Sequence, residues 1–264
     1  MSEGDSQQRG ERIQSVATGF RILEAVRRRD RVGVTELADA LDLPKSTVHH
    51  YLSTLAADNY LAREDGTYRL GLGLFTLGAK ARTRERIYHV AKPNVDRLAE
   101  TTGEQARLVV ERDGRGITLY QAAGERVDDP LTDAGSVEDL HCTAAGKAFL
   151  AELPDDRLEA VLADHPLPRR TPNTITDADE LRAALADIRE RGVAFDDEER
   201  DEGVRCVASA VSDRSGDLLG AISVSGPADR LTDERFRSEI PSRLRNVVGV
   251  VEFTSTYSEW ADGL

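Results

Sequence analysis

The stretch Leu41-Asp42-Leu43-Pro44-Lys45-Ser46-Thr47-Val48-His49 decides the fold of the N-terminal part of this chain. A residue that precedes a proline is pushed out of helical geometry, and proline itself suits the first position of a helix. The sequence therefore predicts a turn that ends at Leu43 and a new helix whose first residue is Pro44. A short turn between two helices is typical of a helix-turn-helix.

The helix predicted over residues 44–55 has two unlike faces. Val48, Leu52 and Leu55 recur at helical spacing, so we expect them to be buried. The opposite face offers short hydroxyls, two imidazoles and one lysine, with no large or acidic side chain. Such a face can lie against a phosphate backbone and reach base edges in the major groove. The DNA contacts expected from this helix are Lys45, Ser46, Thr47, His49, His50 and Ser53.

The flanking residues complete a winged unit. Apolar residues recur at helical spacing from residue 16 to 26, and this first helix stops at Arg27-Arg28-Arg29. A short second helix follows, with Thr35 as its expected N-cap. Asp65-Gly66 is a strong hairpin signal between strands over residues 61–64 and 67–70. A hairpin after a helix-turn-helix is a wing, and we add Thr35 and Arg69 to the expected DNA contacts. The alternative is a purely structural three-helix domain.

Residues 14–78 resemble the winged helix-turn-helix of IclR-type transcriptional regulators, with the Leu-Pro-Lys-Ser-Thr-Val-His string at 43–49 as the most specific match. The resemblance implies binding to double-stranded operator DNA. Two positions depart from the family pattern, since His50 stands where Arg is usual and Asn59 where Gly is usual. Asn tolerates a positive φ, so the turn before the wing should survive. A neutral His50 should remove one phosphate contact.

Residues 71–87 read as a linker helix whose apolar residues, Leu72, Leu74, Phe75 and Leu77, need a partner. We expect that partner to be a second copy of the chain, because dimerisation lengthens the DNA site that is read. The predicted organisation is a disordered polar arm over residues 1–12, a DNA-binding domain over 13–70, this linker, and a C-terminal domain over 88–264.

The C-terminal region alternates strand and helix signals, which indicates an α+β architecture with a largely antiparallel sheet. Strands are expected over 105–111, 116–123, 193–196, 206–211 and 218–225, and helices over 144–153, 156–163, 179–191 and 233–255. In the last two strands one face carries Val207, Val211, Ile222 and Val224. The other face carries only small residues, namely Cys206, Ala208, Ala210, Ala221, Ser223 and Ser225. The space above them can hold a closely packed helix or a ligand.

This region is similar to the GAF-like effector domain of the same family, through the strings at 141–148, 196–206 and 223–227. The resemblance implies that a small organic acid or sugar-derived metabolite binds here as effector. The implied effector contacts are Ala144, Ala145, Asp196, Cys206, Ser223 and Ser225. Other interpretations stay open: Asp196 in a solvated acidic run, Cys206 as a core residue, and serines bonded only to backbone.

Charge divides the chain in two. The 264 residues hold 35 Lys+Arg against 48 Asp+Glu, a net of −13, and only four of the cations are lysines. Residues 1–90 hold 14 cations against 12 carboxylates, whereas residues 91–264 hold 21 against 36. The N-terminal part is thus suited to an anionic partner. The acidity favours adaptation to a salt-filled cytoplasm over a merely acidic mesophilic protein.

Other functional classes fit the sequence less well. No phosphate-binding glycine loop, His-Glu metal motif or Gly-x-Ser-x-Gly elbow is present, so an enzyme is not expected. A metal or thiol-redox sensor built from His141, Cys142 and Cys206 is the main alternative, although this spacing is weak for zinc. We expect no metal and no cofactor. Without a signal peptide or membrane span, and with two cysteines, the sequence predicts a cytoplasmic protein.

Overall fold

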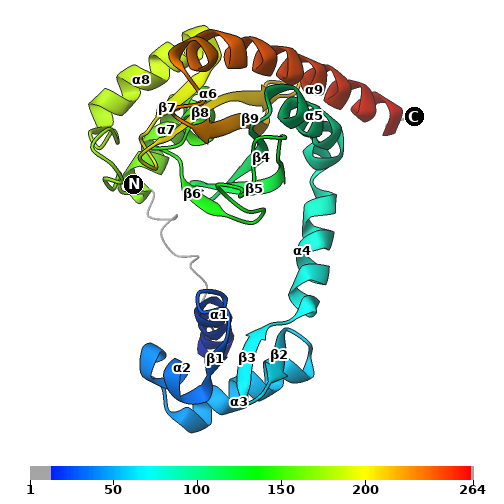
Figure 1. Cartoon of the computed structure of the whole chain (residues 1–264), viewed down its shortest axis with the longest axis vertical. Coiled ribbons are helices and arrows are strands. Elements are labelled where there is room, and N and C mark those ends of the chain that lie inside the picture. The colour runs from blue at the N-terminus through cyan, green and yellow to red at the C-terminus, as the bar shows by residue number, and fades with distance from the viewer. Residues whose placement is uncertain (1–12, 263–264) are drawn as a thin grey trace, which may run out of the picture. The chain divides into compact units, whose positions relative to one another are not determined.

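A computed structural model describes residues 13–262 of the chain, and their side chains as far as Thr256. The predicted polar arm over residues 1–12 lies outside the described residues. The chain forms two compact units that divide between Arg84 and Glu85 (Figure 1).

The N-terminal unit is a small helical domain with a three-stranded sheet. Its sheet has the order β1-β3-β2, and its strands are antiparallel. The elements are α1 (Gln14–Arg27), β1 (Val32–Gly33), α2 (Val34–Leu41), α3 (Lys45–Ala57), β2 (Leu61–Glu64), β3 (Thr67–Leu70) and α4 (Leu72–Arg84). This order confirms the predicted winged helix-turn-helix.

The three helices and the wing enclose one apolar core. Val48 and Leu52 of α3 are fully buried there, and Leu55 is half-buried at its edge. Ile22, Leu37 and Tyr68 bring α1, α2 and β3 into the same core. The spacing of apolar residues in α3 therefore placed its buried face correctly and left the opposite face in solvent.

Two predicted helix starts in this unit are wrong by one or two residues. Gly33, not Thr35, is the N-cap of α2, so Thr35 lies inside the first turn and caps nothing. Pro44 is the N-cap of α3, and the first helical residue is Lys45. Neither Gly33 nor Pro44 makes a side-chain capping hydrogen bond, so no capping side chain marks either start in the sequence.

The wing has one strand more than expected. β1 pairs with β3 through Val32 opposite Tyr68, on the side of β3 away from β2. A two-residue strand has no measurable periodicity, so the sequence could not reveal it. Asn59 has a φ of 61°, as its position before the wing requires.

α4 is shorter than the predicted linker helix, since it ends at Arg84 and α5 begins at Arg86. Its start is held against the turn before the wing. The Gly71 amide donates to the Tyr60 carbonyl at 2.8 Å, and a Cβ on Gly71 would lie 2.3 Å from the Asn59 carbonyl oxygen. None of its residues is buried within its unit, and Leu72, Phe75 and Leu77 are exposed.

The C-terminal unit is built on a six-stranded antiparallel sheet of order β6-β5-β4-β9-β8-β7. This confirms the α+β class and the largely antiparallel sheet. The strands are β4 (Gln105–Arg112), β5 (Arg115–Ala122), β6 (Val137–Asp139), β7 (Ala194–Asp197), β8 (Val204–Ser212) and β9 (Leu218–Pro227). β6 was not predicted, because it is a three-residue strand inside a long loop.

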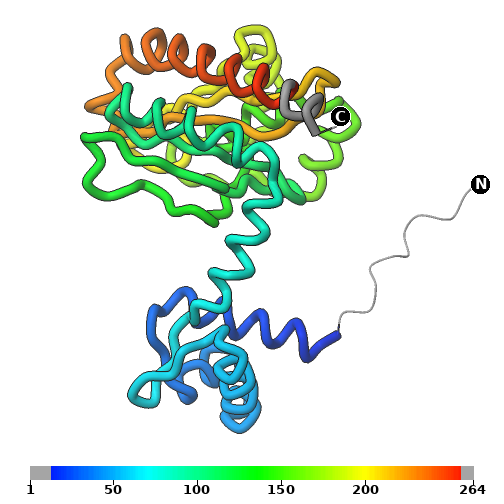
Figure 2. Tube along the Cα trace, turned by 90° about the vertical axis from the view of Figure 1, so that its right-hand side faces the viewer, coloured from blue at the N-terminus to red at the C-terminus, as the bar shows by residue number. Residues whose placement is uncertain are grey.

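Helices cover both faces of this sheet. α5 (Arg86–Thr102) and α9 (Ile240–Asp262) lie side by side on one face, over Val207, Val211, Ile222 and Val224 (Figure 2). The other face packs against α6 (Ala144–Glu152), with α7 (Asp155–Asp164) and α8 (Ala178–Arg191) outside it. Ala208 and Ala221 touch α6, so the middle of the small-residue face is filled by a closely packed helix.

The C-terminal helix differs from the prediction over 233–255. A π-helical turn, η1 (Arg235–Glu239), precedes α9, and α9 continues to Asp262. Among the described residues, no helix is both long and apolar enough to cross a membrane.

Candidate functional site

The outer face of α3 carries the predicted DNA contacts. Lys45, Ser46, His49, His50 and Ser53 are exposed, and Thr47 is half-buried at the start of the helix. Within residues 13–262 the Lys45 ammonium makes no ion pair, so its charge is available to a phosphate. Lys45, His49 and Ser53 follow one another at i, i+4 and i+8, and Ser46 and His50 at i and i+4 lie beside them, so these five share one side of the helix, with Thr47 at its edge.

The other two predicted contacts lie on different elements. Thr35 is exposed on α2, and Arg69 is half-buried on β3. The Arg69 guanidinium donates to Glu64 at 2.6 Å, and Arg31 pairs with the other oxygen of the same carboxylate at 2.8 Å. The hydrogen bond from Arg69 holds the pKa of Glu64 below its usual range. The wing therefore presents two arginines whose charge is partly neutralised by one glutamate.

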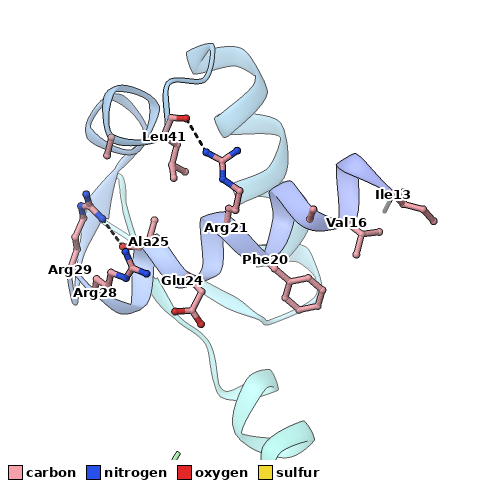
Figure 3. A pocket seen from close by; sticks show the side chains of 11 residues that line it. Ile13, Val16, Phe20, Arg21, Glu24, Ala25, Arg28, Arg29 and Leu41 are labelled. Carbon is pink, nitrogen blue, oxygen red and sulfur yellow. Dashed lines mark hydrogen bonds between the residues drawn. The ribbon is translucent and has the colours of Figure 1, made fainter. Parts of the chain in front are cut away.

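A hollow of about 860 Å³ runs along α1 in the same unit (Figure 3). Ile13, Val16 and Phe20 are all more than half exposed along it. Arg21 closes its far side by donating to the Leu41 carbonyl at 3.3 Å. A row of exposed apolar side chains is unusual for a surface that stays in water.

In the C-terminal unit the sheet register brings the predicted effector contacts together. Asp196 of β7 lies opposite Cys206 of β8, and Cys206 lies opposite Ser225 of β9. Ser223 lies one step along the same face, opposite Ala208. The four strand residues thus form one continuous patch, although up to 29 residues separate them in sequence.

Asp196 is a buried carboxyl group, only 3% exposed. Its side chain accepts hydrogen bonds from the backbone amides of Glu199 at 2.8 Å and Arg200 at 3.4 Å. Burial raises its pKa to about 7. The interpretation of Asp196 as part of a solvated acidic run is therefore wrong, although Glu198 and Asp201 nearby belong to that run.

The two serines do not bond merely to backbone. Ser225 donates to the Cys206 sulfur at 3.1 Å, and both groups are buried. Ser223 is fully buried, and its hydroxyl has no partner among the described residues. A buried hydroxyl without a partner costs free energy, which indicates a position shaped for something other than stability.

The start of α6 is held close to this patch. Thr143 is its N-cap and accepts from the Gly146 amide at 3.1 Å, while the helix offers no acceptor for the amides of Ala144 and Ala145. A Cβ on Gly146 would lie 2.2 Å from the Leu140 carbonyl oxygen, so only glycine permits this approach. Ala144 and Ala145 share an apolar cluster with Cys206.

The charged residues of two buried ion-pair groups near the patch were missed by the sequence analysis. Arg107 of β4 lies opposite Ser223 in the register and pairs with Glu138 of β6 at 2.8 Å, with both side chains 3% exposed. Arg200 donates to the same Glu138 oxygen at 2.6 Å. Lys147 of α6 forms a second buried pair, with Glu199. No local pattern marks a strand arginine as buried, because its partner lies 31 residues away.

A cavity of about 190 Å³ adjoins the patch and has Gln105 and Ser225 in its wall. The loop between β5 and β6 forms its other side, through Asp128, Asp129 and Leu131. Gln105 anchors that loop by accepting from the Leu131 amide at 2.9 Å and donating to the Thr132 carbonyl at 2.9 Å. The loop therefore forms one wall of the cavity beside the patch.

The alternative metal or thiol-redox site does not assemble as proposed. His141 and Cys142 lie near Asp139, with their ligand atoms within 4.8 Å, but Cys206 is not in this group. Arg115 and Arg170 both pair with Asp139, and two guanidinium groups disfavour a bound cation. Burial raises the pKa of Cys142 to about 11 and also raises that of Cys206, which disfavours the thiolate form that metal binding and redox exchange need.

Comparison with known proteins agrees with both halves of this description. Residues 15–65 match the IclR helix-turn-helix domain, and residues 79–251 match the family described as bacterial transcriptional regulator IclR C-terminal. The chain belongs to the IclR family.

Individual members of the IclR family match most of the chain. It is 34% identical to the "Probable HTH-type transcriptional regulator ArcR" of Halobacterium salinarum, over 91% of this chain and 93% of that protein. It is 33% identical to the HTH-type transcriptional repressor AllR of Escherichia coli K12, over 78% of this chain and 77% of AllR. The crystal structure of Thermotoga maritima IclR has a TM-score of 0.77 at 28% identity, over 92% of this chain and 99% of that one.

An IclR homologue of Microbacterium hydrocarbonoxydans, crystallised with 4-hydroxybenzoate, shares the fold with a TM-score of 0.79 at 24% identity, over 92% of this chain and 99% of that one. The matching proteins are regulators of transcription, which confirms that this chain is a DNA-binding regulator with a ligand-binding C-terminal domain and not an enzyme.

Proposed function

We propose that this IclR-family regulator binds operator DNA through the outer face of α3 and changes its DNA affinity when a small organic acid or sugar-derived metabolite binds beside Ser223. The observation that carries the proposal is the patch of Asp196, Cys206, Ser223 and Ser225, assembled from three strands and buried. The homologue that was crystallised with an organic acid supports this class of ligand. We further propose control of a catabolic pathway, in the cytoplasm, where operator DNA lies.

The DNA part of the proposal is tested on α3. Lys45→Ala with Thr47→Ala should abolish operator protection in a footprinting assay, because both residues stand at the helix end that enters the groove. Thr54→Ala is the matched control, since among the described residues the Thr54 hydroxyl bonds only to the His50 carbonyl of its own helix. Unchanged protection by the double variant would exclude α3 as the reading helix.

The effector part is tested at Ser223. Ser223→Leu should block the response of DNA binding to the effector and leave DNA binding itself intact, because the larger side chain would take the place of the proposed ligand. Ser215→Leu, in an exposed loop, is the control. A Ser223→Leu protein that responds normally would remove Ser223 from the effector site.

We also propose that the working species is a dimer or a dimer of dimers. Two exposed apolar surfaces of the N-terminal unit support this: the hollow along α1, and Leu72, Phe75 and Leu77 on α4. A second copy of the chain would bury these residues and place a second α3 on the operator. Phe20→Glu with Phe75→Glu should shift sedimentation toward the monomer, whereas an unchanged sedimentation coefficient would place the interface elsewhere.

A further inference from the structure

One edge of the buried Arg107 guanidinium has unused hydrogen-bond donors. Its Nη1 donates to Glu138 at 2.8 Å and to the Thr132 hydroxyl at 3.0 Å. Its Nε has no partner among the described residues, and its Nη2 has only a long contact of 3.9 Å to the Cys206 sulfur. Nε and Nη2 belong to the same edge of the planar group, and this is an edge that binds the two oxygens of a carboxylate in parallel.

The direction of that edge is fixed by its neighbours. Nη2 points to Cys206, whose sulfur also accepts from Ser225. Ser223, with its unpartnered hydroxyl, lies directly opposite Arg107 in the β4–β9 register. The unfilled edge therefore faces the patch that is proposed to hold the effector, and Ser225 connects that patch to the 190 Å³ cavity.

The ion pair of Arg107 is not arranged for stability alone. Glu138 uses a single oxygen for both Arg107 and Arg200, and its other oxygen is buried without a partner among residues 13–262. Taking such a pair out of water is costly unless its hydrogen-bonding atoms are satisfied. On the side away from Glu138, the Arg107 Nε and the Ser223 hydroxyl both lack partners among the described residues. Unsatisfied buried groups on facing residues are a feature of binding sites.

We propose that Arg107 is the specificity-determining residue of the effector site, and that its Nε–Nη2 edge binds the carboxylate of a small organic acid in a two-point contact with Ser223 opposite. This inference rests on the proposed effector function of the C-terminal unit and narrows the ligand to a carboxylate anion. Glu138 holds the guanidinium from its other side through Nη1, and Thr132 ties it to the loop between β5 and β6.

The test measures binding of the full chain to acetate, lactate, benzoate and 4-hydroxybenzoate, each compared with its own uncharged amide, by calorimetry and by thermal shift. At least one acid should bind the wild-type chain while its amide binds at least tenfold more weakly. Arg107→Lys keeps the positive charge for Glu138 but lacks the two-donor edge, so it should lose roughly tenfold or more in affinity for that acid.

Glu138→Gln is the matched control, because it alters the same ion pair and keeps the two-donor edge of Arg107. It should retain or increase the affinity for the acid. Should Arg107→Lys not fold, Arg107→Gln combined with Glu138→Gln removes both charges together and should still lose the preference for acid over amide.

Equal binding of an acid and its amide, equal binding of the acid by Arg107→Lys and wild type, or binding of none of the acids at millimolar concentration would each overturn the proposal. Operator binding measured without any acid tests the DNA-binding function separately from carboxylate binding by Arg107. Arg107→Lys should protect the operator like wild type, so a failure in footprinting by the Lys45 and Thr47 variants concerns α3 and not Arg107.

Discussion

Asp196 shows how a single buried group makes stability depend on pH. Its pKa of about 7 in the folded chain exceeds the value near 4 expected when unfolded. Between these two pH values the folded state holds a proton that the unfolded state has released. The contribution of Asp196 to the free energy of unfolding therefore falls as pH rises through this window.

We predict that Asp196→Asn flattens this dependence. An amide oxygen can still accept from the Glu199 and Arg200 backbone amides, but it carries no titratable charge. Between pH 5 and pH 8 the wild-type chain should lose about 2 kcal/mol more stability than the variant, measured by urea unfolding. Asp164→Asn, at an exposed position, should follow the wild type, and parallel curves for all three proteins would contradict the assigned pKa.

Residue identity alone predicted part of this site. The small-residue alternation in β8 and β9 placed Cys206, Ser223 and Ser225 on one face, and the structure has them there. Arg107 and Glu138 could not be found, because an arginine in an alternating strand is the usual sign of a solvent-exposed position. Their burial depends on β6 pairing with β5 at the sheet edge, and that strand of three residues has no periodic signal.

At the level of elements, α4 depends on a close approach at Gly71, the residue before its first turn. We predict that Gly71→Ala destabilises the N-terminal unit by about 1–3 kcal/mol, because its Cβ would clash with the Asn59 carbonyl oxygen. Gly78→Ala is the matched control on the same helix, where nothing lies within 4 Å of an added Cβ. It should stabilise α4 by roughly 0.5–1 kcal/mol in thermal unfolding. An unchanged unfolding temperature in Gly71→Ala would show that this turn is not tightly packed.

The wing offers a second prediction at this level. Glu64 neutralises part of the charge of both Arg31 and Arg69, so Glu64→Gln should leave two cations more available to phosphates. We expect operator affinity to rise about threefold at low salt in a fluorescence anisotropy titration, with a smaller gain as salt is added. Lower affinity in the variant would mean that Glu64 holds Arg31 and Arg69 in place for DNA binding, and that it does not weaken their attraction to DNA.

Over the whole molecule, the charge is divided as the sequence predicted, with a net of +2 before residue 91 and −15 after it. In the structure, Arg69 and Arg29 of the N-terminal unit lie beside Glu64 and Glu36, so part of its positive charge is already paired with carboxylates. We predict a shallow dependence of DNA affinity on salt, with less than about a hundredfold loss between 50 and 200 mM, measured by anisotropy. A steeper loss would indicate many more phosphate contacts than this unit presents.

Strand β4 has a further consequence for how such a regulator can diverge. Its residues Gln105, Arg107 and Val109 face α6 and the polar patch, whereas Ala106, Leu108 and Val110 face the core under α5. Because neighbours in a strand point to opposite faces, residues on the pocket side can be substituted one at a time while those on the core side stay unchanged. Different positions of the same strand thus determine ligand preference and folding. After gene duplication, one copy can therefore come to respond to a new ligand while its protein still folds.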